Sequence, residues 1–331
     1  MRAILPIAVV CLLTGCTSYR DFTLPLPDGP VSDPEFAWEV LPHPVLSRGG
    51  PGEFDSVDAL NPSVVFKEGR YYNFYSGWDG RQWRTGLAIS DDGLRWCKRG
   101  PVLAPDPSSW EGDYIAANGS ALLVESEFYY WYQAARPPRI GLARSRDGVH
   151  WSKRGEPVLG LGPRGSWDER AVADPYVFRV GDWFYMYYLG EDRARRQRLG
   201  VARSRDGIRW QKLRTNPVLE LGEVGAFDEA GLGEPAVWAS HGWYWMLYTG
   251  RDRQERRRIG LARSRDGVRW QRISPRPVFE APAQWASAVI CDPSVLVSGG
   301  ELRVWFGGGD RPRPDENLNG QIGLAVARFR P

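Results

Sequence analysis

One phrase is written three times along this chain, and a looser copy occurs once more. IGLARSRDGVHW ends at Trp151 and near-copies end at Trp210 and Trp270, whereas TGLAISDDGLRW ends at Trp96. The tryptophans are thus 55, 59 and 60 residues apart. A period of this length indicates a repeat architecture, in which each unit buries its faces only against its neighbours.

Every repeat has the same order of short segments. A polar residue and a Pro or Gly precede a short apolar run, and an aromatic run such as WFYMYYL (183–189) follows. Next come the GLARS segment, a tight Asp-Gly turn and a segment that starts at the Trp. Runs that are bulky on both faces and too short for helices are typical of strands buried on both sides. Four antiparallel strands per repeat indicate the blades of a β-propeller.

The two ends of the chain complete the blade count. A fifth unit stops at Pro331 without a Trp strand, whereas WEVLPHPVL (38–46) has the pattern of a fourth strand but no blade before it. We therefore expect an all-β, five-bladed propeller over residues 36–331, with the N-terminal strand closing the last blade and removing exposed edges. The Ser-Arg-Asp-Gly-x-x-Trp segment is then a turn that pins the third strand to the fourth. Its likeness to the sialidase Asp-box does not indicate sialidase chemistry.

The first 35 residues differ from the repeats. Residues 1–15, MRAILPIAVVCLLTG, contain one early Arg and an apolar run too short to span a bilayer, which predicts a signal peptide. Residues 13–16, Leu-Thr-Gly-Cys, resemble a bacterial lipobox, which implies a lipid on Cys16. Residues 16–35 would then form a lipidated tether, and the protein would be held by this anchor in the bacterial cell envelope, at a periplasmic or outer-membrane face. The alternative is an ordinary secretory signal with an incidental Cys.

Composition argues against several other functions. The formal charge of +3 is too small to suggest nucleic acid as a partner. The three histidines lie in separate strands and turns, so we expect neither a histidine metal site nor a Ser-His-Asp triad. We expect no cofactor and a monomer; calcium held by carboxylates stays open. Cys97 and Cys291 are too few for a disulfide framework, and their redox state stays open.

Residues that recur at one position of the repeat are expected to be structural, such as Asp55, Asp168 and Asp228 at the blade entrances. The position before the innermost strand instead varies among polar residues. Since first strands lie nearest the axis, these side chains should converge on the mouth of a central cavity. Capping of the strand start is the alternative, but capping does not require Glu, and converging carboxylates shift one another's pKa. The five ring positions are Asn61, Asn118, Asp174, Glu234 and Asp292.

Five blades whose inner strands present carboxylates resemble the glycoside hydrolase superfamily that includes families 43, 62, 32 and 68. The resemblance implies an acidic base or nucleophile from blade one, a pKa-tuning Asp from blade three and a Glu general acid from blade four. Asp174, in ADPYVF, takes the tuning role and Glu234, in GEPAVW, takes the acid role. The expected activity is therefore cleavage of a glycan.

Blade one departs from that pattern, because Asn61 stands where the base or nucleophile belongs. An amide neither takes a proton from water at neutral pH nor forms a glycosyl ester. Asp58 is a substitute whose set-back position would leave room for a water and favour an inverting mechanism, unless it only caps its own turn. Two alternatives stay open. Inorganic phosphate attacks, as in the propeller phosphorylases of family 130, or catalysis has been lost and the propeller only binds sugar.

The loops between second and third strands should open on the same face as the ring. They contain fifteen Arg and eight acidic residues. Because Arg suits carboxylate, sulfate and phosphate groups, we expect an anionic glycan or a phosphate co-substrate; Arg–Asp pairs on a solvated rim or contacts with lipid headgroups are the alternatives. Trp78 and Trp83 could stack on a sugar face. With Asn61, Asn118, Asp292 and Arg84 they complete the predicted substrate-binding set.

Overall fold

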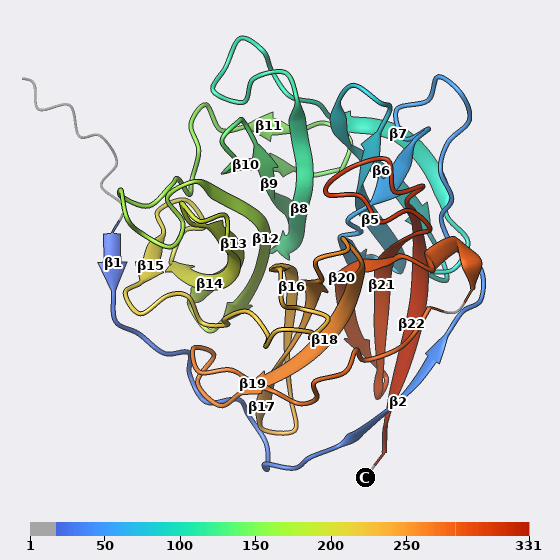
Figure 1. Cartoon of the computed structure of the whole chain (residues 1–331). Helices are drawn as coiled ribbons and strands as arrows, with labels where there is room; N and C mark the ends of the chain where they lie inside the picture. Colours follow the sequence, from blue (N-terminus) through green and yellow to red (C-terminus); the bar gives the residue numbers. More distant parts are fainter. Residues whose placement is uncertain (1–17, 282, 331) are drawn as a thin grey trace, which may run out of the picture.

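The computed structural model describes residues 18–281 and 283–330, and it consists of 22 strands and one short 3-10 turn, η1 (Gln284–Ala286). The strands form five antiparallel blades around a central axis (Figure 1). This confirms the five-bladed propeller. In the described residues no helix has the length and hydropathy needed to cross a membrane. Residues 1–15 and Cys16 lie outside the described residues, so the signal peptide and the lipid anchor stay predictions.

The blades follow one another along the chain. Blades one and two consist of β3 (Asp58–Leu60), β4 (Val64–Lys67), β5 (Arg70–Trp78), β6 (Trp83–Ser90) and β7 (Cys97–Leu103), then β8 (Ile115–Val124), β9 (Glu127–Ala134), β10 (Arg139–Ser145) and β11 (Ser152–Lys153). Blades three and four consist of β12 (Ala171–Val180), β13 (Trp183–Glu191), β14 (Gln197–Ser204) and β15 (Gln211–Leu213), then β16 (Gly231–Ser240), β17 (Trp243–Arg251), β18 (Arg257–Ser264) and β19 (Gln271–Arg272).

Blade five contains both ends of the propeller. It consists of β20 (Val289–Ser298), β21 (Glu301–Gly309), β22 (Gln321–Arg330) and β2 (Glu35–Val40). Strand β2 pairs antiparallel with β22 along its whole length, from Glu35 opposite Arg330 to Val40 opposite Ala325. The N-terminal strand therefore closes the ring, as the sequence predicts.

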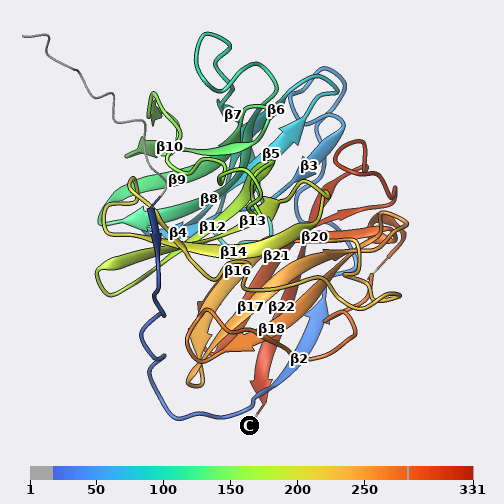
Figure 2. The ribbon, with the colours of Figure 1, turned by 60° about the vertical axis from the view of Figure 1, so that its left-hand side comes forward.

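The segment before β2 lies against the propeller. Strand β1 (Ser18–Arg20) pairs in parallel with β15, the outer strand of blade three. Leu24 is buried against blade four, and the Tyr244 hydroxyl donates a hydrogen bond to the Pro25 carbonyl at 2.6 Å. Figures 1 and 2 both show this segment running along the outside of the ring from β1 to β2. Residues 18–35 of the predicted tether thus lie against the propeller, where a few apolar side chains dock this Pro- and Asp-rich stretch.

The repeated turn has the architectural role that the sequence predicts. In blade three, the Ser204 hydroxyl accepts a hydrogen bond from the Gly207 N–H at 3.0 Å, and the Asp206 carboxylate accepts two more from the following backbone. The Gly207 carbonyl accepts the indole N–H of Trp210 at 3.1 Å and that of Trp131, from the neighbouring blade, at 2.8 Å. One turn thus joins two strands of its blade and an adjacent blade.

A buried acid, tyrosine and cation lock the outer part of each of the first four blades. In blade three, Asp168 accepts hydrogen bonds from the Tyr188 hydroxyl at 3.2 Å and from Lys212 Nζ at 2.5 Å. The side chains of Asp168 and Lys212 are fully buried. The equivalent groups in blades one, two and four are Asp55, Tyr75 and Lys98; Glu111, Tyr132 and Lys153; and Asp228, Tyr248 and Arg272.

Side chains also join neighbouring blades close to the axis. Four first strands carry a hydroxyl two residues after the ring position, and each hydroxyl binds the backbone of the first strand in the next blade. The pairs are Ser63 with Ala121, Ser120 with Val177, Tyr176 with Val237, and Ser294 with Val64, at 2.8–3.0 Å. Ser294 thereby fastens blade five to blade one. Blade four has Ala236 at this position, which offers no such group.

We predict that Lys212→Met lowers the free energy of unfolding by about 3–5 kcal/mol, because it leaves the Asp168 carboxylate buried without its cation. The double variant Asp168→Asn with Lys212→Met should recover part of that loss, since the uncompensated charge is gone. Urea unfolding of the three proteins measures both effects. A single variant as stable as the wild type would show that the lock does not stabilise the blade.

Candidate active site

The five ring residues share an unusual backbone conformation. Four of them lie at a register shift within the first strand of their blade, Asn61 lies in the break between β3 and β4, and each has a positive φ. Asn and Asp tolerate this left-handed region, whereas for other residues it costs about 1–2 kcal/mol. The φ values are 48° for Asn61, 48° for Asn118, 47° for Asp174, 46° for Glu234 and 53° for Asp292. Backbone geometry thus accounts for four of the five residue types but not for Glu234.

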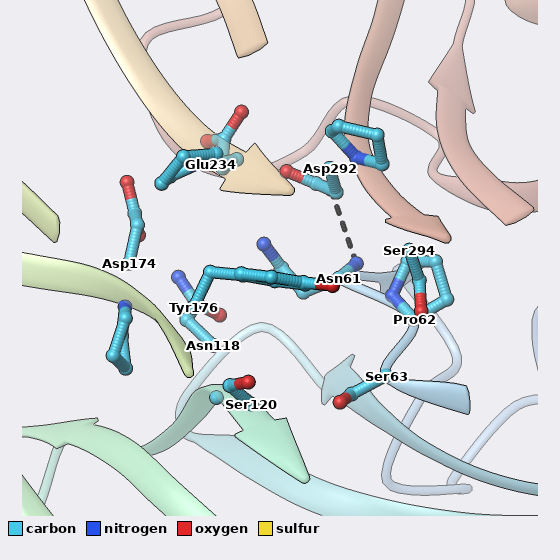
Figure 3. A pocket seen from close by; sticks show the side chains of 14 residues that line it. Asn61, Pro62, Ser63, Asn118, Ser120, Asp174, Tyr176, Glu234, Asp292 and Ser294 are labelled. Atoms are coloured by element: carbon cyan, nitrogen blue, oxygen red, sulfur yellow. Dashed lines mark hydrogen bonds between the residues drawn. The ribbon is translucent and has the colours of Figure 1, made fainter. Parts of the chain in front are cut away.

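The bulges direct the five side chains towards one another at the axis. Figure 3 shows the carboxylates of Asp174, Glu234 and Asp292 along one side of the ring and the amides of Asn61 and Asn118 along the other. All five residues line a cavity of about 850 Å³. A small cavity of about 40 Å³ beneath them is bordered by the hydroxyls that join the blades. The structure therefore brings the predicted ring together at the floor of a cavity large enough for a small oligosaccharide.

Acidic groups are most concentrated at the seam between blades four and five. Oxygen or sulfur atoms of Glu234, Cys291 and Asp292 all lie within 4.8 Å of one another. The Asn61 N–H donates a hydrogen bond to Asp292 at 3.0 Å, which links blade one to this cluster. Burial, and next the charge of Glu234, raise the pKa of Asp292 well above its ordinary value. Calcium prefers six to eight oxygen ligands, so two carboxylates and a thiol do not suit it.

Asp174 flanks Glu234 on the other side. Burial raises the pKa of Asp174 well above its ordinary value, and the charges of Glu234 and Asp315 add to this effect, while Arg257 opposes it. A negative charge on Glu234 therefore disfavours ionisation of the carboxyl groups on both sides of it. This arrangement suits the predicted role of Asp174 as a residue that tunes Glu234.

Glu234 itself has an unused oxygen. Its Oε2 atom is buried and has no hydrogen-bond partner among the described residues. Leaving such an atom unpaired costs about 1–3 kcal/mol; a bound hydroxyl could donate a hydrogen bond to it, and a protonated Oε2 could itself donate to an ether oxygen.

Sequence reasoning did not single out Arg257, the first residue of β18. Its side chain is buried beside the acidic cluster, and it donates a hydrogen bond to the Pro314 carbonyl. Burial alone would lower the pKa of Arg257, but Cys291, Glu234, Asp292 and Asp315 raise it. The other blades have Trp, Arg or Gln at the start of the third strand. The test of variation between repeats, applied to this position as well, could have found it.

Asp58 does not have the predicted role of base. It is fully buried, and its carboxylate accepts hydrogen bonds from the backbone N–H groups of Asn317, Leu318 and Gly320 at 2.7–2.9 Å. Both oxygens are thus used to hold the loop between β21 and β22. Asp58 is a cap, although for a loop of blade five rather than for its own turn.

Only one member of the predicted group Trp78, Trp83 and Arg84 reaches the cavity. The two indoles stack with ring centroids 5.3 Å apart, and Trp83 lines the cavity while Trp78 packs in the core beneath it. Arg84 pairs with Asp79 and lies over the Phe54 ring, away from the cavity lining. The placement of Trp78 and Arg84 in the substrate site is therefore wrong.

Part of the positive charge of the rim is neutralised by acids that lie outside the five loops. Arg193 pairs with Glu169 at 3.1 Å and Arg253 with Glu229 at 3.3 Å, and both glutamates come from the loops that enter the blades. The cavity lining itself contains five arginines and five carboxylates. Among the lining arginines, Arg170 and Arg251 form ion pairs, and Arg257 lies beside the acidic cluster. Arg136 and Arg195 remain, and the described part of the chain shows no ion pair for either of them.

Comparison with known proteins identifies relatives of the fold. Residues 61–225 match the family described as glycosyl hydrolases family 32 N-terminal domain. A Mycobacterium tuberculosis protein described as uncharacterized is 28% identical over 244 residues, covering 68% of this chain and 77% of that protein. A 1,2-beta-oligomannan phosphorylase of Thermoanaerobacter sp. is 31% identical over 117 residues, covering 32% of this chain and 39% of the phosphorylase.

A solved structure extends the likeness over the whole propeller. It comes from work on the GH130 family of mannoside phosphorylases, described as containing glycoside hydrolases that target beta-1,2 mannosidic linkages in Candida mannan. Its TM-score is 0.69 at 18% identity, and the match covers 93% of this chain and 99% of that one. At this identity the likeness establishes the fold.

The raised pKa of Asp292 predicts a pH-dependent stability. Below its ordinary pKa of 3.8 the Asp292 carboxyl is protonated in both the folded and the unfolded chain. As the pH rises, the unfolded chain loses this proton first, so the free energy of unfolding falls until the pH has passed the raised pKa of the folded chain. We predict that Asp292→Asn, which keeps an acceptor for the Asn61 N–H, has a higher Tm than the wild type at pH 7 and an equal Tm near pH 4. Thermal unfolding from pH 4 to 8 measures this, with Asp182→Asn, at an exposed carboxylate, as the control. A difference that does not change with pH would contradict the assignment.

Proposed function

Because the chain belongs to the five-bladed β-propeller glycoside hydrolase superfamily, we propose that it cleaves glycosidic bonds in an oligosaccharide or polysaccharide, with Glu234 as the general acid. The observation that carries this proposal is the unpaired Oε2 of Glu234 at the floor of the cavity. A leaving-group oxygen bound there would complete the hydrogen bonding of the site.

Two features of its neighbours support Glu234 in this role. Glu234 has the one ring side chain whose type the left-handed backbone does not favour, so its selection is better explained by chemistry than by conformation. The carboxyl groups of Asp174 and Asp292 on either side become less acidic when Glu234 gives up its proton, because its negative charge disfavours theirs. An acid that gives and regains a proton in each turnover needs this kind of environment.

The attacking group decides between two reactions. With Asn61 in blade one, no ring residue of that blade can activate water, and this absence favours phosphate as a second candidate nucleophile. The similarity to a 1,2-beta-oligomannan phosphorylase supports the same candidate. Hydrolysis remains the first proposal because the Asp292 carboxyl accepts the Asn61 N–H, so a negative group lies next to the position from which a phosphate dianion would have to attack. A propeller that binds sugar without turnover is the third outcome that experiment must separate.

An acidic group on the substrate would find partners on one side of the cavity. Arg136 lies over the Tyr114 ring, with 3.3 Å between the guanidinium carbon and the ring centroid, and Arg195 sits in the tight turn after β13. Both line the cavity, on the side formed by blades two and three. We propose that they receive a carboxylate or sulfate of the glycan.

We predict that Glu234→Gln lowers turnover by about 100- to 10,000-fold and leaves glycan binding intact, because the amide fills the same space but cannot donate the proton. Purified protein would be screened against neutral and acidic oligosaccharides, with and without inorganic phosphate, by product analysis and calorimetry. Glu127→Gln, on the opposite face of the propeller, is the matched control.

The outcomes of this screen separate the three functions. Product formation that needs no phosphate supports hydrolysis, whereas strict dependence on phosphate establishes a phosphorylase. Binding heat without product from the wild-type protein across the panel would leave only the sugar-binding function.

We predict that Arg195→Gln weakens the binding of an acidic oligosaccharide by about tenfold and leaves the binding of its neutral counterpart unchanged, because a charge-assisted hydrogen bond is lost. The control is Arg193→Gln in the same turn, whose side chain pairs with Glu169. Equal losses for both glycans would argue against an anionic substrate.

A further inference from the structure

The loop between β21 and β22 is much longer than its counterparts. It spans eleven residues, 310–320, whereas the equivalent loops of the other four blades have four or five. Loop 310–320 contributes Pro314, Asp315 and Leu318 to the cavity lining. In Figure 1 this red loop reaches from blade five towards the inner ends of β5 and β6 in blade one. Blade five thus supplies a wall to the side of the cavity where Asn61 lies.

Three sets of contacts fix this wall. The Pro314 carbonyl accepts a hydrogen bond from Arg257 of blade four. Glu316 accepts hydrogen bonds from the Trp83 indole at 3.2 Å and from the Tyr114 hydroxyl at 2.6 Å. Asp58 holds the backbone of residues 317, 318 and 320. Asp315 therefore lies between two anchored residues, and its backbone position is well defined.

Asp315 differs from the other four carboxylates of the cavity. Asp174 and Asp292 are packed on either side of Glu234, and Asp292 also accepts the Asn61 N–H. Glu191 is occupied by Arg170 at 3.1 Å and by Gln197 at 3.4 Å. Asp315 is solvent-exposed and, within residues 18–281 and 283–330, makes no side-chain hydrogen bond.

The position of Asp315 is also separate from that of the acid. It is not a member of the close cluster formed by Glu234, Cys291 and Asp292, and the guanidinium of Arg257 interacts with both groups. An inverting mechanism needs room for a water molecule between the base and the sugar, and Asp315 comes from the wall of the cavity and not from the ring at its floor. Although the residue is exposed overall, the neighbouring cavity wall partly desolvates the Asp315 carboxyl and raises its pKa, and the Arg257 guanidinium opposes this shift by favouring the ionised form.

We propose that Asp315 is the general base of this site and takes over the role that Asn61 cannot perform; the inference rests on the proposed function. Asp315 removes a proton from a water molecule, whose oxygen forms a bond to the anomeric carbon. The bond from that carbon to the leaving oxygen breaks, and Glu234 donates its proton to the leaving oxygen. The configuration at the anomeric carbon is inverted. The charge of Asp315 also disfavours phosphate, so it selects water.

Replacement of Asp315 by Asn, combined with chemical rescue, tests this assignment. We expect Asp315→Asn to lower kcat for hydrolysis by about 100- to 1,000-fold with little change in KM, because the substrate still binds but water is not activated. Sodium azide, an anionic nucleophile that needs no base, should restore bond cleavage and yield a glycosyl azide of inverted configuration. Glu316→Gln, which disturbs the anchor of the same loop, should change KM and show no response to azide.

The result that would overturn the inference is equally defined. Asp315→Asn with wild-type kcat, or with lost activity that azide does not restore while its Tm is unchanged, would show that Asp315 is not the base. Retained configuration in the first product of the wild-type enzyme, read by NMR, would have the same meaning. If the wild-type protein turns over no glycan at all, the proposed function fails first and the inference falls with it.

Discussion

The left-handed backbone at the head of each first strand is the constraint from which the site follows. Five strands converge on the axis, and each has one extra residue there. Because this bulge interrupts the strand, the side chain of the extra residue turns inward and does not follow the blade. Asn and Asp adopt the left-handed backbone conformation at a lower conformational energy than Glu does. The propeller thus offers five equivalent positions, and the choice of residue at each determines the chemistry.

The electrostatics of the cavity depend on how these five positions are filled. The carboxylates come from blades three, four and five, and the amides from blades one and two, so the negative charge gathers on one side. Arg257 lies at that side and holds Pro314 of the wall formed by residues 310–320, which reaches from there to Trp83 and Tyr114 of blades one and two. The same wall is held by Asp58 and Glu316, so structural carboxylates place a loop whose exposed member, Asp315, is free to react. Asp58 and Glu316 therefore anchor the loop, and the neighbouring Asp315 is left for the proposed chemistry.

The repeats made much of this arrangement predictable. Copies of one phrase provided the blade count, the closing strand and the ring positions, because variation within a repeat separates architecture from function. The locks show the limit of this approach. The recurrence of Asp168 and its equivalents marked them as structural, but their partners Tyr188 and Lys212 lie 20 and 44 residues further along and became evident only in three dimensions. Asp58 was misjudged for the same reason, since its partners lie about 260 residues away.

The charge of the rim shows a different limit. A count over the five loops found an excess of arginine, but acids of the blade entrances, such as Glu169 and Glu229, fold back onto the same rim. Asp315 was included in that count and could not be distinguished from its neighbours, because only the contacts of residues 314 and 316 reveal which side chain in the loop remains unoccupied. The sequence gives the type of each residue in the loops, but it does not tell which of their side chains form hydrogen bonds or ion pairs in the folded protein.

The most direct test of this account is a crystal structure of the Glu234→Gln variant with a bound oligosaccharide identified by the activity screen. We predict a glycosidic oxygen within hydrogen-bond distance of the residue 234 side chain, and a water molecule or its vacant site between Asp315 and the anomeric carbon. A sugar bound elsewhere on the propeller, or one whose glycosidic oxygens all lie beyond the reach of residue 234, would contradict the assignment of the cavity as the catalytic site.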